Sequence, residues 1–266
     1  MDCKNCARPL RTDYSFCAHC GAKVIRNRIT IKSLWYDFTE RFFNLDNTFL
    51  KTFKHLFSRP DDVIVGYIKG VRKKYLNPVS YFTIAIMLGG LFVYVHNEFF
   101  PDALNFKFLY PDESTLTDSE KFGMDFQKRI NYYLFKYQSL FYVAMLPFLA
   151  LISRLVFINR KQFNLSEHFV MNIYAYSQMS IVINSVYILL LWNSKALYYA
   201  SIGNLVLQIG YFTWVFYKIF NLSIKQTLIK LLFFLLILAV VFFGLMIVAS
   251  LYLVFMTDTF QNMAPK

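Results

Sequence analysis

Five long stretches of this chain carry no Asp, Glu, Lys or Arg, and they constrain the fold more than any other feature. A soluble protein interrupts its apolar runs with charge, whereas about 20 uncharged, mainly apolar residues span the bilayer hydrocarbon as a helix. The composition agrees, because 57% hydrophobic residues with 30 Phe is too apolar for an ordinary soluble domain. We therefore expect an all-α, multipass transmembrane bundle. The stretches are 75–97, 137–153, 169–194, 196–217 and 231–257.

The predicted bundle covers residues 78–258. Its fifth span is the most apolar, since only Gly244 and Ser250 interrupt its core. The second is short unless it continues through Arg154, whose side chain can reach the membrane interface from one turn inside the helix. The five spans are expected near residues 78–96, 137–158, 169–192, 198–218 and 231–256.

The basic residues predict the orientation of the bundle. With the N-terminus in the cytoplasm, 21 of the 28 Lys and Arg residues fall on the cytoplasmic side. This is the bias that sets topology, so the C-terminus is expected outside. The formal charge of +12 is then explained by topology and by attraction to anionic lipid headgroups. We expect the lipid bilayer as a partner and no nucleic-acid binding.

The four cysteines form the most specific motif in the chain. Cys3, Cys6, Cys17 and Cys20 make two CxxC pairs in a head predicted to cover residues 1–25. Two such pairs complete a closed tetrahedral thiolate shell, which predicts a zinc ribbon with one structural Zn²⁺ per chain. Disulfides would need an oxidising compartment, and a redox CxxC would need a βαβ unit that this head cannot form. His19 is expected to be an exposed residue of the second pair.

Residues 30–77 are predicted to form a cytoplasmic segment of amphipathic helices. One helix is expected over 31–45 and a second after a cap at Asn47, and Pro60 should end the second helix and open a third. His55 is expected to be solvated. A basic run then precedes the first span, and it is either an interfacial anchor or a contact site for a partner or lipid. The run consists of Lys69, Arg72, Lys73 and Lys74.

Several motifs in the first 95 residues resemble a known family. These are the paired CxxC head with FCAHCG, then ITIKSLW, FFNLDNTFLKTFKHLFSRP and VIVGYIKGVRKKYLNPVSYF. The chain is similar in them to bacterial multipass membrane proteins that have an N-terminal zinc ribbon and no assigned function. The resemblance implies a bacterial inner membrane and supplies no catalytic residues.

The predicted spans offer little for catalysis. They contain no Asp or Glu, and His96 and His168 are expected on opposite sides of the membrane, so we expect no enzymatic activity. They do contain an uncharged polar stripe on the third span, with possible partners on the fourth. The stripe is explained either by interhelical packing or by a solute pathway. Its main residues are Asn172, Gln178 and Asn184, facing Asn204 and Gln208.

Two functional hypotheses remain open. The first is a non-enzymatic docking or assembly platform, in which the ribbon and amphipathic helices bind a protein partner on the cytoplasmic side. The alternative is a transporter or channel for a small or lipidic solute that uses the polar stripe. A continuous polar cavity between the third and fourth spans would favour transport, whereas a filled bundle would favour docking.

Overall fold

A computed structural model describes residues 2–22, 24, 30, 48–104, 117, 123, 133 and 136–263. The chain divides into two compact units, Met1–Asn47 and Thr48–Lys266. Within the described residues the regular structure is helical, apart from isolated bridge residues in the first unit that include the antiparallel pair Asp2 and Pro9. Residues 48–77, predicted to form a separate cytoplasmic segment, belong by their contacts to the same unit as the long helices. The helix predicted over 31–45 and the cap at Asn47 lie outside the described residues.

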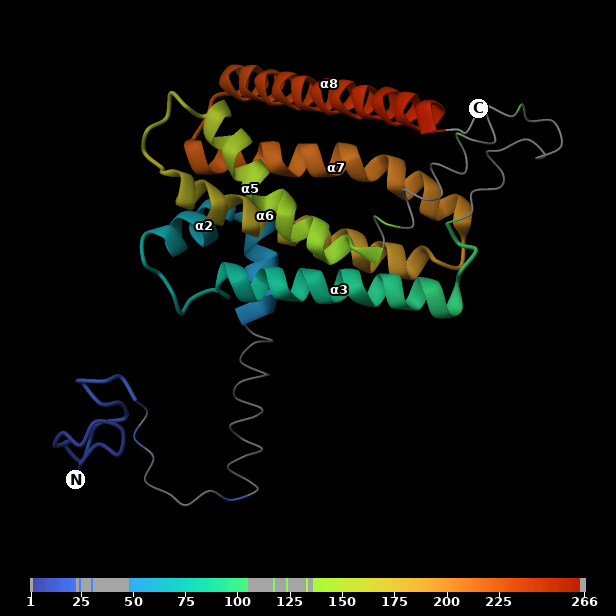
Figure 1. Ribbon diagram of the computed structural model, residues 1–266. Helices are drawn as coiled ribbons and strands as arrows, with labels where there is room; N and C mark the ends of the chain where they lie inside the picture. Colours follow the sequence, from blue (N-terminus) through green and yellow to red (C-terminus); the bar gives the residue numbers. More distant parts are fainter. Residues whose placement is uncertain are drawn as a thin grey trace. The chain divides into compact units, whose positions relative to one another are not determined.

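The second unit is a helical bundle with one helix at its centre (Figure 1). Every residue from 171 to 181, in α6, is buried. This helix contacts α2, α3, α5 and α7, while α8 lies against α5 and α7. In chain order the described helices are the segment 48–58, α2 (Pro60–Ile68), α3 (Pro78–Phe99), α5 (Gln138–Val156), α6 (Leu165–Leu190), α7 (Ser194–Phe220) and α8 (Ile224–Met263).

Asparagine side chains begin three of these helices. Asn77 accepts from the Ser80 N–H over 2.8 Å, just before Pro78 in the first turn of α3. Asn164 and Glu167 form a reciprocal capping box at the start of α6, and Asn193 accepts from the backbone of Ala196 at the start of α7. Each cap satisfies backbone donors that have no partner inside the helix. As predicted, Pro60 opens a helix, with Asp61 and Asp62 in its first turn.

All five predicted spans coincide with long helices. Among the described residues, three of these helices are long and apolar enough to cross a membrane. These three are α3, α6 and the Ile224–Val241 part of α8. The apolar part of α5, Leu140–Val156, is shorter. Polar residues such as Asn204 and Gln208 lower the mean hydropathy of α7. The described helices are therefore those of a membrane protein with at least three candidate spans, and the other two spans stay predictions.

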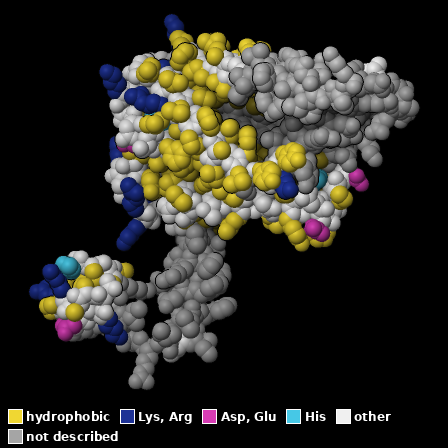
Figure 2. All heavy atoms as spheres, in the orientation of Figure 1, with side chains coloured by type: hydrophobic (Ala, Val, Ile, Leu, Met, Phe, Trp, Pro, Cys, Tyr) yellow, Lys and Arg dark blue, Asp and Glu magenta, His cyan; other side chains and the backbone are white. Residues whose placement is uncertain are grey.

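Apolar side chains cover much of the second unit's visible face, and Lys and Arg side chains gather at one of its ends (Figure 2). That end is where α2 lies and where α8 begins (Figure 1). Among the candidate spans, none of the Ile224–Val241 window is buried inside the protein. An apolar helix with this much exposed surface is suited to lipid rather than to water.

Candidate functional site

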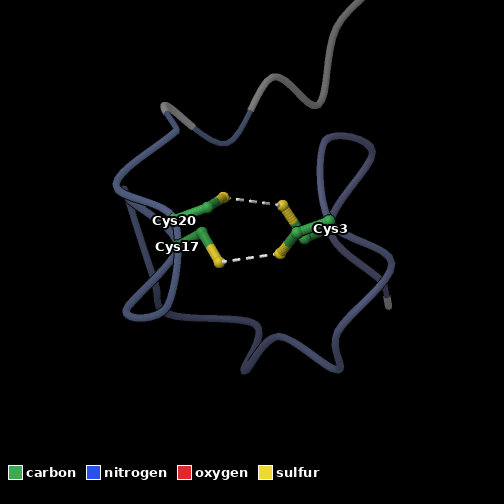
Figure 3. A group of neighbouring side chains, drawn as sticks. Cys3, Cys17 and Cys20 are labelled. Carbon is green, nitrogen blue, oxygen red and sulfur yellow. Dashed lines mark hydrogen bonds between the residues drawn. The ribbon is translucent and has the colours of Figure 1, made fainter.

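The four cysteines of the first unit lie together with their sulfur atoms facing one another (Figure 3). All four Sγ atoms are within 4.8 Å of each other. The Cys3–Cys20 and Cys6–Cys17 pairs are separated by 3.6 and 3.7 Å. Four thiolates around an ion at about 2.3 Å would stand roughly 3.8 Å apart at the corners of a tetrahedron. The cluster can therefore hold one metal ion with a complete thiolate shell.

Two turns with the same hydrogen-bond pattern carry these cysteines. In the first, Ala7 N–H donates to the Cys3 carbonyl over 2.7 Å, and in the second, Gly21 N–H donates to the Cys17 carbonyl over 2.9 Å. The residue that closes each turn has a left-handed backbone, with φ of +55° at Ala7 and +70° at Gly21. Glycine adopts this conformation readily, whereas alanine does so at a cost. The first turn is thus the more strained of the two.

The surroundings of the cluster fit a metal centre that is held by cysteine alone. Cys3, Cys17 and Leu10 form a small core in the described part of this unit, and Cys20 is exposed. Hydrogen bonds from the Asn5 side chain and the Ala22 backbone lower the pKa of the Cys20 thiol to about 6. A lowered pKa favours the thiolate, which is the form that binds metal. His19 is exposed and outside the group of ligand atoms, as expected.

In the second unit, Lys74 of the basic run belongs to a network of polar contacts. Lys74 Nζ lies 2.8 Å from the Asp62 carboxylate, which also accepts from the Tyr75 hydroxyl over 2.6 Å. That hydroxyl is 2.6 Å from His55 Nδ1, and Arg59 Nη2 is 3.3 Å from His55 Nε2. If Tyr75 donates to Asp62, then Nδ1 carries the His55 proton and Nε2 accepts from Arg59. This network of contacts links the 48–58 helix, α2 and the segment that leads into α3.

Neighbouring groups in this network shift the pKa values of Asp62 and His55. Hydrogen bonds from Lys74 and Tyr75 hold the pKa of the Asp62 carboxyl below its usual range. Partial burial, with the nearby Arg59 charge, lowers the pKa of His55. His55 is half-exposed, and its contact with Tyr75, 20 residues further along the chain, was not predicted from the sequence.

The rest of the basic run is exposed but does not act as one patch. The Arg72 guanidinium lies 4.2 Å from the centre of the Tyr67 ring and donates to its hydroxyl over 2.9 Å. Lys69 lines an open hollow together with Asp61 and Lys218. Lys73 is exposed. Arg72 and Lys74 are thus both engaged within the protein.

The polar stripe of α6 contributes to fixing the 48–58 helix and the start of α3. Gln178 is fully buried; its carbonyl oxygen accepts from the Tyr81 hydroxyl and its amide donates to the Phe53 carbonyl over 3.2 Å. Tyr174, one turn earlier, donates to the Leu76 carbonyl over 2.7 Å. The stripe residue Gln178 therefore joins three parts of the chain that are far apart in sequence.

Two aromatic residues of α7 complete the attachment of the 48–58 helix. Tyr211 donates to the Leu56 carbonyl over 3.1 Å, and Trp214 donates to the Phe57 carbonyl over 3.2 Å. Carbonyls in the last turn of a helix have no partner within it, so these side chains act as a C-terminal cap. The sequence did not predict a role for Tyr211 or Trp214. An aromatic residue in a sequence does not indicate a hydrogen-bond partner some 150 residues away.

The remaining stripe residues make local contacts or are half-buried. Asn172 donates to Ser153 Oγ of α5 over 2.8 Å, and Asn184 donates to the Ser180 carbonyl of its own helix over 2.8 Å. Asn204 and Gln208 are half-buried on α7. His168, which the sequence places at the start of this helix, is fully buried with Nδ1 3.1 Å from Ser153 Oγ. A spacing of 15 residues between Ser153 and His168 gave no signal of this contact.

The fold and the cysteine cluster together define a class of protein: helical, apolar enough to cross a membrane and equipped with a potential metal centre. Residues 46–89 match a family described as "Protein of unknown function (DUF3667)". The matched stretch contains the 48–58 helix, α2, the basic run and the first half of α3. No curated protein and no solved structure matches the chain. The likeness therefore covers the part of the second unit that the Gln178 and Tyr75 contacts hold together.

Proposed function

We propose that this chain is a non-enzymatic protein of the bacterial inner membrane, with five spans and a cytoplasmic zinc ribbon that docks a protein partner. The observation that carries the proposal is the closed set of four cysteine sulfurs within 4.8 Å of one another. A four-thiolate shell leaves no open coordination position for catalysis and is typical of structural zinc. The metal is accordingly a folding element of a binding module.

The size of the head supports a dependence on metal. Its described core consists of Cys3, Cys17 and Leu10, with Cys6, Tyr14 and Val24 packed against it. So small a core cannot supply the free energy of folding, and structural zinc contributes about 10–16 kcal/mol in small domains near neutral pH. Losing the metal should therefore unfold the head and remove its binding surface.

The hydrogen bonds of the polar stripe support docking over transport. Gln178, Asn172 and Asn184 direct their amides at backbone or side-chain acceptors inside the bundle. Groups used in this way stabilise helix packing and are not available to carry a solute. Gln178 is thus explained by its role in fixing the 48–58 helix and α3, and Asn172 by its contact with α5.

Comparative affinity capture tests the docking proposal. Tagged wild-type protein, Cys17→Ser and His19→Ala would be extracted in mild detergent, and captured proteins compared by quantitative mass spectrometry. His19→Ala is the matched control, because it changes the same turn without removing a ligand atom. We expect a shared partner with wild type and His19→Ala that Cys17→Ser loses. An identical set of captured proteins from all three would contradict the proposal.

A further inference from the structure

The second unit contains an open, shallow pocket near the end where α5 ends and α8 begins. Helices α5, α6, α7 and α8 all contribute to its lining. The contribution of α8 follows helical periodicity, with side chains three, four and seven positions apart on one face. These are Thr227, Lys230, Leu231 and Phe234. The same helix presents its other faces to the surroundings, because none of Ile224–Val241 is buried.

The walls of this pocket are suited to hydrocarbon. Eight of the thirteen lining residues are apolar, and they include Phe157 directly after α5 and Phe212 and Phe216 from α7. The polar groups in the wall already have partners, since the Asn172 amide donates to Ser153 Oγ over 2.8 Å. Ligand pockets in proteins are likewise mostly apolar, with a small number of polar groups. The lining thus favours an apolar chain over a polar solute.

Lys230 places a positive charge at the same pocket. Lys230 Nζ donates to the Val156 carbonyl over 2.5 Å and to Asn159 Oδ1 over 2.8 Å. These bonds use two of the three donors of the ammonium group, and Nζ also lies 5.4 Å from the centre of the Phe157 ring. Arg160 reaches Gln226, one turn before Lys230 on α8, at 3.4 Å.

Positive charge dominates the segments around this lysine. Residues 153–168 and 218–230 contain six Lys or Arg residues and one acid, Glu167. That carboxylate is used in the capping box of α6, where it accepts from the Asn164 N–H over 2.7 Å. Figure 2 shows Lys and Arg side chains gathered at this end of the unit. Basic pockets between transmembrane helices bind anionic lipid headgroups.

We propose that this pocket binds one anionic phospholipid, with an acyl chain between α8 and the aromatic side chains of α5 and α7 and the headgroup phosphate at Lys230. An exposed apolar helix forms one wall, so a lipid reaches the pocket directly from the bilayer. The site is separate from the ribbon and from the contacts of Gln178, and it does not depend on the docking proposal.

Photolabelling of the full chain in phosphatidylcholine vesicles tests this assignment. The probes are phosphatidylglycerol and phosphatidylcholine that carry the same diazirine in the acyl chain, with labelled peptides mapped by mass spectrometry. We expect phosphatidylglycerol to label the peptides around Phe212 and Leu231 more than phosphatidylcholine does. Lys230→Gln should lower that headgroup preference about fivefold, which corresponds to the roughly 1 kcal/mol that one cation contributes near a charged membrane surface.

Two further variants make the test specific. Lys225→Gln is the matched control, because Lys225 is an exposed lysine on α8 outside the pocket lining, and it should leave the preference unchanged. Thr213→Trp fills the pocket and should reduce labelling by both probes. Equal labelling by the two headgroups, or an equal loss of preference in Lys225→Gln and Lys230→Gln, would overturn the proposal. Labels confined to the outward faces of α7 and α8 would also overturn it, since they would mark only surrounding lipid.

Discussion

The Tyr174 hydroxyl donates to the Leu76 carbonyl over 2.7 Å, although 98 residues separate the two in sequence. The Leu76 N–H, in turn, donates to Thr52 Oγ1 over 2.9 Å. Both backbone groups of Leu76 are thus satisfied by side chains, one from α6 and one from the 48–58 helix. A buried backbone group without a partner costs free energy comparable to a lost hydrogen bond, so these contacts fix how the chain enters α3.

The first prediction concerns Gln178, which bridges Tyr81 and the Phe53 carbonyl. Gln178→Leu removes both bonds and leaves the buried Tyr81 hydroxyl without this acceptor, so the free energy of unfolding should fall by roughly 1–3 kcal/mol. Asn184→Leu is the comparison, because its amide bonds to Ser180 of its own helix, and it should cost about 0.6 kcal/mol. Thermal unfolding in detergent measures both. Equal losses would contradict the bridging role of Gln178.

The second prediction concerns pH. Because the folded state lowers the pKa of Asp62, the unfolded state binds this proton more tightly, and protonation favours unfolding. The stabilising contribution should be fully present above the ordinary Asp pKa of about 3.9 and lost as pH falls through the lower folded value. The melting temperature of wild type should exceed that of Asp62→Asn at pH 5–8 by a small amount, since exposed pairs contribute about 0.2–1 kcal/mol.

The difference between wild type and Asp62→Asn should then disappear in acid. The exposed neighbour Asp61 provides the matched control as Asp61→Asn. A difference that grows as the pH is lowered would show that the sign of the argument is wrong.

The third prediction concerns the two turns of the metal cluster. Ala7 and Gly21 occupy equivalent positions with positive φ, and no atom lies within 4 Å of where a Cβ on Gly21 would stand. Ala7→Gly should relieve the backbone cost and Gly21→Ala should add one, each by roughly 1 kcal/mol, or about fivefold in metal affinity. Competition for zinc with a chromophoric chelator measures the affinity. Opposite shifts in the two variants are required, and shifts of the same sign would refute the equivalence of the turns.

The fourth prediction concerns topology. With 21 of 28 basic residues on the predicted cytoplasmic side, a reporter fused at Asn164 should read as cytoplasmic and one fused after Lys266 as outside. Reporters active on opposite sides of the membrane distinguish the two locations. The reverse pattern at both sites would invert the bundle and place the cysteines in an oxidising compartment.

The accuracy of the sequence predictions depended on the range of the interactions involved. The cysteine cluster could be predicted because two CxxC spacings place their sulfurs locally, and α2 because Pro60 and two following aspartates indicate a helix start. The position of the 48–58 helix could not, since it depends on donors in α6 and α7 more than 100 residues away. The hydrogen-bond partner of His55 could not be predicted for a similar reason, because Tyr75 lies 20 residues further along the chain.

The central claim is that the four cysteines hold one structural zinc ion, and elemental analysis tests it most directly. The account predicts close to one zinc per chain in wild type and in His19→Ala, and loss of most of it in Cys17→Ser, with the helical content of the bundle retained by circular dichroism. Wild-type protein purified without chelator and found to contain no zinc, or to contain disulfides within its CxxC pairs, would contradict the account.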